Sequence, residues 1–84
     1  MVSQAFTDAA SRVKDLATSP DNNNLLELYS LYKQATIGDC TVARPTGLLN
    51  AKEKAKWDAW KGKEGLSKED AEKQYIALVE KLSQ

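Results

Sequence analysis

Apolar residues recur at intervals of three and four positions in four separate segments of this chain of 84 residues. That spacing places them along one side of a helix, whereas a half-buried strand needs strict alternation, which the sequence lacks. The expected helices span about residues 4–16, 22–37 and 51–62, and a fourth begins after Ser67. The pattern therefore predicts an all-α domain of four short helices, although it leaves their pairing open.

Residues with known preferences for helix ends stand at these boundaries. Ser3 precedes the first helix as a favoured N-cap, and Gly38 ends the second in the way a helix C-terminus prefers. Gly62 and Gly65 close the third helix. Ser67 opens the last with a near capping box, in which an aspartate replaces the preferred glutamate.

One predicted connection is long for so small a chain. Residues 38–50 carry no sustained period, and their number exceeds the usual median of about 4–6 residues. Loops of this length are typically functional or mobile. The whole chain, residues 1–84, is expected to form one domain with a modest core.

The rarest residues exclude several functions. The chain has no histidine and a single cysteine, Cys40. Ser-His and Cys-His nucleophiles and a zinc site are therefore excluded, and no carboxylates form a recognisable catalytic pair. A lone cysteine favours a reducing compartment, and no stretch resembles a membrane span or a secretory signal. The sequence thus predicts a cytoplasmic binding protein without catalytic residues, metal or cofactor.

The charges balance overall but are unevenly distributed. The chain has 12 basic and 12 acidic residues. Residues 33–63 hold seven of the basic side chains and only three of the acidic ones. A neutral protein with a basic middle segment indicates a local anion site, not a general nucleic-acid surface.

One helical face of the second segment combines aromatic rings with a cation. Tyr29, Tyr32 and Lys33 are neighbours on that face because they are three and four positions apart. A ring can stack on a base while the ammonium group binds a phosphate. From spacing alone, the favoured interpretation is structural, with two core tyrosines and a solvated lysine, since such spacing is common in amphipathic helices.

The third segment adds further cations and both tryptophans. Lys52 and Lys56 share a face near the expected helix N-terminus, where the macrodipole disfavours cations, which makes a bound anion more plausible. Trp60 is interpreted as a core anchor, and Trp57 either packs likewise or edges a ligand pocket. Cys40 has no assigned role.

Several motifs together resemble the acyl-CoA-binding protein family. Residues 25–39 resemble its second-helix signature. Arg44-Pro45, residues 54–60, residues 67–71 and Tyr75-Ile76 follow in the family's order and near its spacing. The resemblance extends over essentially the whole chain. It implies an up-down-down-up bundle of four helices with a shallow bowl for the ligand.

The resemblance also implies roles for individual residues in binding the CoA head group. It places the adenine on Tyr32 and the ribose 3′-phosphate at Tyr29, Lys33 and Lys56. The remaining head-group positions that it implies are Lys14, Lys52 and Tyr75. This family pattern reverses the structural interpretation that spacing alone favoured for the two tyrosines and the lysine.

The resemblance assigns Leu25, Leu26 and Ala55 to the groove that holds the acyl chain. Three departures from the family pattern concern the loop, the groove and the rim. Residues 45–48 form a stretch that is one residue longer than the usual turn, which would reshape the loop. Ala51 stands where many members carry an aromatic residue, which would widen the groove. Neutral residues replace frequently basic rim positions at Ala17 and Ser19.

The leading hypothesis is a monomeric cytoplasmic carrier and buffer of medium- to long-chain acyl-CoA esters. It implies long-chain acyl-CoA as the ligand and transient contacts with acyl-CoA-using enzymes or membranes. The main alternative is a helical interaction module that binds another protein and has a vestigial bowl. A thioesterase is a weaker alternative because no nucleophile–base pair is visible. A nucleic-acid-binding role is weaker still, given the zero net charge.

Overall fold

The computed structural model describes residues 2–16, 20–47 and 50–83, and all regular structure within these ranges is α-helical. The helices are α1 (Gln4–Lys14), α2 (Asn22–Thr36), α3 (Ala51–Lys61) and α4 (Lys68–Leu82). All four lie in the predicted segments, and α1 ends two residues earlier than expected. After Lys14 its last turn tightens, because the N–H of Asp15 bonds to the carbonyl of Arg12 at 3.0 Å.

Three helices begin with a side-chain cap. Ser3, Asp21 and Ser67 each accept a hydrogen bond from the backbone N–H three residues further along, which satisfies one of the free donors of that helix. This confirms the N-caps predicted at Ser3 and Ser67, while Asp21 was missed. α3 differs, because the amide of Asn50 donates to the carbonyl of Thr46 at 2.7 Å and makes no cap bond.

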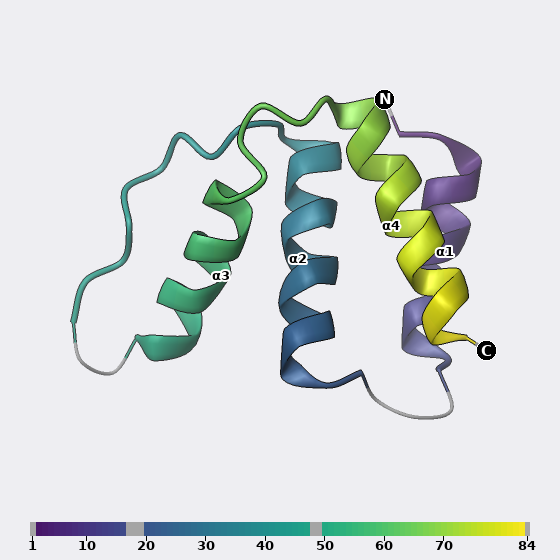
Figure 1. Cartoon of the computed structure of the whole chain (residues 1–84), viewed down its shortest axis with the longest axis horizontal. Coiled ribbons are helices and arrows are strands. Elements are labelled where there is room, and N and C mark those ends of the chain that lie inside the picture. Colours follow the sequence, from purple (N-terminus) through teal and green to yellow (C-terminus); the bar gives the residue numbers. More distant parts are fainter. Residues whose placement is uncertain (1, 17–19, 48–49, 84) are drawn as a thin grey trace.

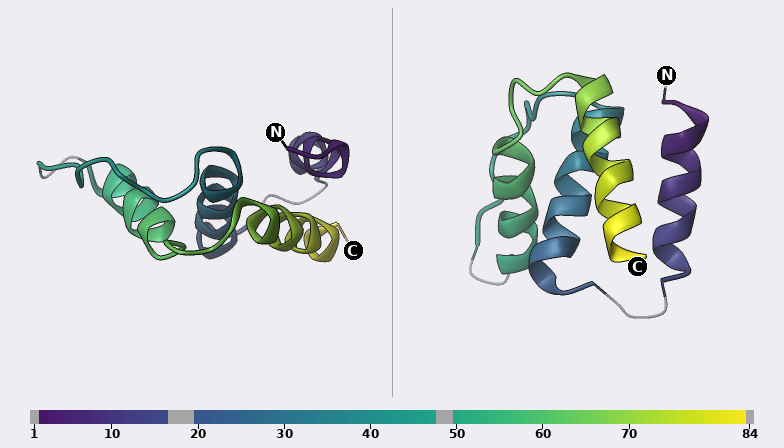
Figure 2. Two further views of the ribbon diagram at one scale, coloured as in Figure 1. Left: turned by 90° about the horizontal axis from the view of Figure 1, so that it is seen from above. Right: turned by 45° about the vertical axis from the view of Figure 1, so that its right-hand side comes forward.

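In the view of Figure 1, α1 runs down, α2 and α3 run up and α4 runs down. Seen from the opposite end, this is the up-down-down-up topology that the resemblance implied. α2 packs against both α3 and α4, and α1 packs against α4. Seen from above, α3, α2 and α4 form a row, and α1 lies on one side of it (Figure 2). The result is a flat molecule of 37 × 28 × 15 Å.

The parallel course of α2 and α3 explains the long connection between them. The chain leaves α2 at one end and must return to the other end before α3 begins (Figure 1). α2 has 15 residues, so the return covers about 22 Å. Gly38 starts the return with a φ of 103°, a conformation that residues with a side chain rarely adopt. The connection is long because of this geometry.

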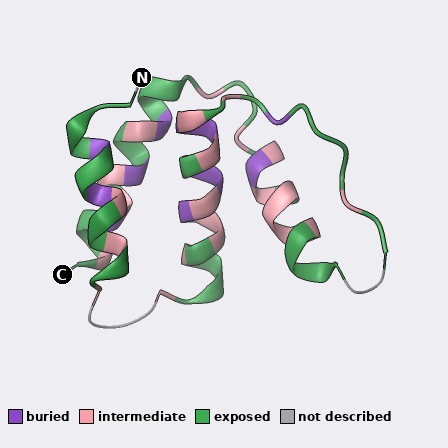
Figure 3. Ribbon diagram, turned by 180° about the vertical axis from the view of Figure 1, so that it is seen from behind, coloured by how far each residue is buried: buried purple, intermediate pink, exposed green. Residues whose placement is uncertain are grey.

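The core lies between α1, α2 and α4. Buried apolar side chains of these three helices form one cluster, and Figure 3 shows buried residues as purple bands on each of them. The cluster contains Phe6, Ala9, Leu28, Leu31, Ala35, Ala71, Tyr75 and Val79. α3 contributes a single buried side chain, Trp60, which is 6% exposed and lies outside this cluster.

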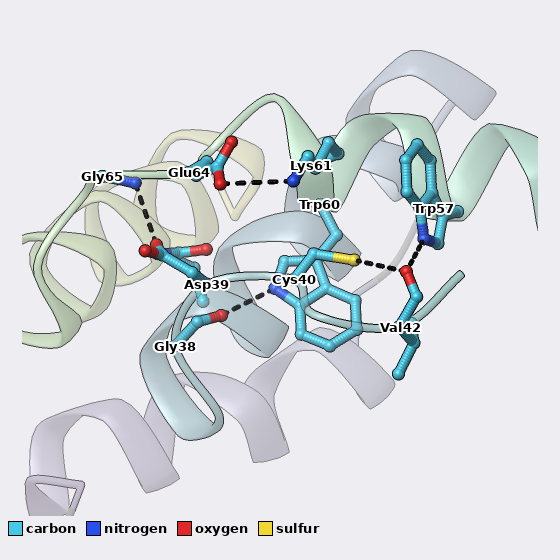
Figure 4. A network of polar contacts seen from close by, with 10 residues as sticks. Gly38, Asp39, Cys40, Val42, Trp57, Trp60, Lys61, Glu64 and Gly65 are labelled. Carbon is cyan, nitrogen blue, oxygen red and sulfur yellow. Dashed lines mark hydrogen bonds and ion pairs between the residues drawn. The ribbon is translucent and has the colours of Figure 1, made fainter. Parts of the chain in front are cut away.

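Polar contacts join α3 to the long connection (Figure 4). The indole N–H of Trp60 donates to the carbonyl of Gly38, and that of Trp57 donates to the carbonyl of Val42, both at 2.8 Å. These bonds run from α3 to the connection. Burial confirms Trp60 as an anchor, while Trp57 is only partly buried.

Ion pairs add to this attachment. The guanidinium group of Arg44 binds both carboxylate oxygens of Asp58, at 2.9 and 3.0 Å. Glu27 on α2 pairs with Lys63, directly beyond α3. Exposed pairs of this kind each contribute little, about 0–1 kcal/mol, so their main effect is to orient the connection and α3.

Asp39 ties the start of the connection to the segment that follows α3. Its Oδ1 accepts hydrogen bonds from the backbone N–H of Gly65 at 2.9 Å and from the side-chain amide of Gln34 at 2.8 Å. These two bonds hold the pKa of the Asp39 carboxyl below its usual value. The carboxylate form of Asp39 is therefore part of the folded structure.

Within the described ranges, no helix is both long and apolar enough to cross a membrane. Nor do these residues contain a group of three or more histidine, cysteine, aspartate or glutamate side chains that could hold a metal ion.

Candidate ligand-binding site

Tyr29 lies at the centre of a cluster of cations between α2 and α3. The Nζ of Lys33 is 5.7 Å from the centre of its ring, and the Nζ of Lys56 is 5.5 Å from the same point. Lys33 comes from the same helix, one turn further on, whereas Lys56 comes from α3. The sequence predicted the first neighbour from helical spacing, and the packing of α3 on α2 brings in the second.

The environment of the Tyr29 hydroxyl group favours its neutral form. Partial burial contributes most to a raised pKa for this phenol, and the negative charge of Glu53 adds to the effect. A neutral phenol remains a hydrogen-bond donor across the physiological range. Together with two ammonium groups, it forms a set of donors suited to a phosphate.

Lys33 also lies over a second aromatic ring. Its Nζ is 5.6 Å from the ring centre of Trp60, so it contacts aromatic faces from both α2 and α3. Two such contacts restrict the position of a long, otherwise flexible side chain. Trp60 thereby serves the cation cluster as well as the attachment of α3.

Tyr32 has a different setting. Its ring stacks on Phe6 from α1, with the ring centres 5.5 Å apart and the planes at 29°. Tyr75 of α4 lies 6.0 Å from Tyr32 and 4.9 Å from Phe6. Tyr32 is nevertheless 42% exposed, because it stands at the edge of this cluster. A ring supported from within and open to solvent is suited to stacking on a base.

Tyr75 differs sharply from Tyr32 in exposure. It is only 5% exposed and belongs to the core cluster. Burial, and to a lesser extent the neighbouring Tyr32, raise the pKa of the Tyr75 phenol. The structure thus places Tyr75 where it supports Tyr32, with little surface left for direct contact with a ligand.

An open groove of about 460 Å³ runs between the first halves of α2 and α3. Its volume lies in the range of small-molecule sites, which is ~300–1,000 Å³. The lining residues are Asn22, Leu25, Leu26, Tyr29, Ala51, Lys52, Ala55 and Lys56. The groove therefore joins the three predicted acyl-chain residues to three of the predicted head-group residues.

The lining divides by helix. α2 supplies the leucines, of which Leu25 is 45% exposed and thus presents unpartnered apolar surface. α3 supplies Ala51 and Ala55, which add only small side chains to the groove lining. The sequence predicted that alanine at position 51 widens the groove, and this stays a prediction. Asn22 was missed, although it lies three and four positions before the two leucines.

Other predicted positions lie apart from this groove or outside the described residues. Lys14 is exposed at the last position of α1, a helix that contributes nothing to the groove lining. Two of the predicted departures involve residues outside the described ranges: the rim positions Ala17 and Ser19, and the end of the segment 45–48. The effects expected there stay predictions. Phe6, which the sequence did not single out for the site, is the ring beneath Tyr32.

Comparisons with known proteins bear on the same arrangement. The family model described as acyl CoA binding protein matches residues 3–79. The chain is 56% identical to acyl-CoA-binding protein homolog 1 of Caenorhabditis elegans, over 93% of this chain and 90% of the relative. It is 54% identical to the acyl-CoA-binding protein of Saccharomyces cerevisiae, over 98% of this chain and 93% of the relative.

Solved structures agree with the sequence relatives. The crystal structure of acyl-CoA-binding protein 2 from Oryza sativa matches with a TM-score of 0.87 at 47% identity, covering 94% of this chain and 87% of that one. The crystal structure of ACBP from Moniliophthora perniciosa matches with a TM-score of 0.88 at 38% identity, covering 98% of this chain and 80% of that one. The chain therefore belongs to the acyl-CoA-binding protein family, which confirms the resemblance and the predicted fold.

Proposed function

We propose that this protein binds medium- to long-chain acyl-CoA esters without covalent bonds, and that it buffers and carries them in the cell. One observation carries the proposal: the groove between α2 and α3 joins an apolar wall to the cluster of Tyr29 and its lysines. An acyl-CoA has the same two chemical parts, an apolar chain and a phosphorylated nucleotide. Membership of the family supports the proposal.

The head group would be held by the cation cluster and the exposed ring. In this arrangement the ribose 3′-phosphate meets Tyr29, Lys33 and Lys56, and the adenine stacks on Tyr32. Charge-assisted hydrogen bonds contribute about 1.5–3 kcal/mol each, and stacking on an aromatic side chain about 1–3 kcal/mol per base. Lys14 and Lys52 are proposed to approach the remaining phosphates, with Lys52 on the groove wall and Lys14 at the end of α1.

The acyl chain would lie along the leucines and alanines of the groove. Each methylene group removed from water contributes about 0.8 kcal/mol, so a long chain can match the whole head group in affinity. The head group would thus determine which ligand is recognised, and the chain would determine how tightly it is held.

The proposed role is that of a monomeric cytoplasmic carrier, not of an enzyme. It needs no cofactor, because acyl-CoA is bound and released unchanged. Delivery would involve brief contacts with enzymes that use acyl-CoA or with membranes.

Calorimetric titration with dodecanoyl-CoA, CoA and dodecanoate tests the proposal. The ester is expected to bind far more tightly than either part, because only it occupies both ends of the site. Lys56→Met is expected to weaken binding of the ester about tenfold, through the loss of a charge-assisted bond to phosphate. Its circular dichroism should stay helical, since the Lys56 side chain is outside the core cluster.

Equal affinity for all three compounds, or none for any, would contradict the function. Tight binding of the ester by both wild type and Lys56→Met would leave the function standing but overturn the placement of the head group.

A further inference from the structure

Glu53 places a carboxylate beside the cation cluster. It lies in the first turn of α3, between Lys52 and Lys56 in sequence. Its Oε1 is 3.8 Å from the Nζ of Lys56, which in turn lies over the ring of Tyr29. The side chain of Glu53 is 60% exposed, so it is free to change rotamer. The same ammonium group thus meets an internal anion at the place proposed for the ligand's phosphate.

A second observation puts the charge of Glu53 close to the Tyr29 hydroxyl group. After partial burial, this carboxylate is the largest cause of the raised pKa of the phenol. Its negative charge is therefore felt at two of the three groups proposed to bind the phosphate. A carboxylate that disfavours a phenolate at this point must also disfavour a phosphate dianion there, because the interaction has the same sign.

Helix chemistry gives Glu53 a structural reason to be present. α3 lacks a side-chain cap, and an acidic residue in the first turn interacts favourably with the helix dipole. It also offsets the lysines around it, which the dipole disfavours. The Glu53 carboxylate therefore stabilises the first turn of α3 and at the same time disfavours a bound phosphate.

We propose that Glu53 is an internal counter-anion that competes with the ligand's 3′-phosphate for Lys56. In the ligand-free protein it pairs with Lys56. When the phosphate binds, the Glu53 side chain turns towards solvent and Lys56 passes to the ligand. The inference rests on the proposed function and adds to it a residue that lowers affinity for one particular phosphate, and so sets how strongly the head group is held relative to the chain.

Glu53→Gln removes the charge while keeping the size and helix propensity of the side chain. Exposed ion pairs have modest energies, so we expect dodecanoyl-CoA to bind about two- to fivefold more tightly to the variant than to the wild type. Binding of the 3′-dephospho form of dodecanoyl-CoA should change by less than that, because the competing phosphate is missing. Titration calorimetry measures both ligands under one buffer and salt condition.

Glu80→Gln is the matched control, since Glu80 is an exposed glutamate near the end of α4 and outside the groove lining. The same change of net charge at that distance should leave both affinities unchanged. In a Lys56→Met background, Glu53→Gln should lose most of its effect, as expected for two residues that act on one ligand group, while the part that acts through Tyr29 remains.

Each result decides between the proposals. If Glu53→Gln binds the 3′-phosphate ester no more tightly than wild type, or tightens both ligands equally, Glu53 is not a competitor. If Glu80→Gln increases the affinity for the ester as much as Glu53→Gln does, the effect comes from net charge alone and the role assigned to Glu53 is wrong. If wild-type protein binds neither ligand, the proposed function itself fails and this inference fails with it.

Discussion

The two halves of the molecule are held together by different interactions. Among the described residues, α1, α2 and α4 share an apolar core of eight buried side chains, whereas α3 contributes only Trp60 to the buried residues and is joined to the long connection by indole hydrogen bonds and an exposed ion pair. Apolar burial stabilises a fold without fixing fine geometry, while directional polar contacts determine where a helix lies. The proposed site lies at the junction, with Tyr32 on the apolar half and Lys56 on the polar half.

The largest difference in stability between the halves should appear when a core side chain is truncated. Phe6→Ala removes a ring that is 2% exposed and that supports Tyr32, and we expect a loss of about 3–5 kcal/mol in the free energy of unfolding. Urea denaturation followed by circular dichroism measures it. Val42→Ala, which shortens an exposed apolar side chain of the connection, should stay within about 0.5 kcal/mol of wild type. Comparable losses in the two variants would refute the contrast.

A smaller and more local effect is expected at the attachment of α3. Trp57→Phe keeps an aromatic ring but removes the donor to the carbonyl of Val42, which should cost about 0.5–1.5 kcal/mol. Amide hydrogen exchange should become faster in the connection and in α3 but not in α1 or α4. Trp60→Phe removes the corresponding donor to Gly38 from a buried ring, so a larger loss is expected there. Uniformly faster exchange throughout the chain would show that the two halves unfold as one unit.

The smallest effect concerns pH and Asp39. The hydrogen bonds from Gly65 and Gln34 lower the pKa of this carboxyl in the folded protein, below the ordinary value of 3.8. Because the folded pKa is the lower one, Asp39 contributes stability that is fully present above the unfolded pKa and is lost as the pH falls through the folded pKa. Asp39→Asn should therefore weaken the dependence of the urea midpoint on pH in the acidic range.

Asp58 provides the comparison for this last prediction. Its carboxyl also has a lowered pKa in the folded protein, caused by the hydrogen bonds from Arg44. Both side chains are exposed, so replacing either aspartate by asparagine should remove only part of the acid dependence of the urea midpoint. An unchanged pH profile for Asp39→Asn would mean that its hydrogen bonds do not favour the charged form.

Much of the fold followed from local patterns. The helical segments were predicted to within a few residues, because apolar spacing and capping residues act within one or two turns. Ser3 and Ser67 form the predicted caps. The early end of α1 and the cap at Asp21 were missed, since helix ends depend on small energy differences between alternative turns.

Less of the candidate site than of the fold could be predicted from the sequence. The neighbourhood of Tyr29 and Lys33 was predicted because one helix contains both. The stacking of Tyr32 on Phe6 joins α1 to α2, and periodicity cannot reveal it. The competing carboxylate of Glu53 went unnoticed for a related reason: its pairing with Lys56 gains importance only when α3 brings both beside Tyr29.

The helices, the all-α class and the chemical character of the candidate residues could be predicted from the amino-acid sequence, because they depend on side chains and on neighbours within a few positions. Family motifs extended this to the topology. The contacts across helices became visible only in the folded chain: Lys56 with Tyr29, Phe6 with Tyr32, and the leucines of α2 with the alanines of α3. Contacts between distant segments depend on how whole helices pack, and that packing is a property of the folded chain as a unit.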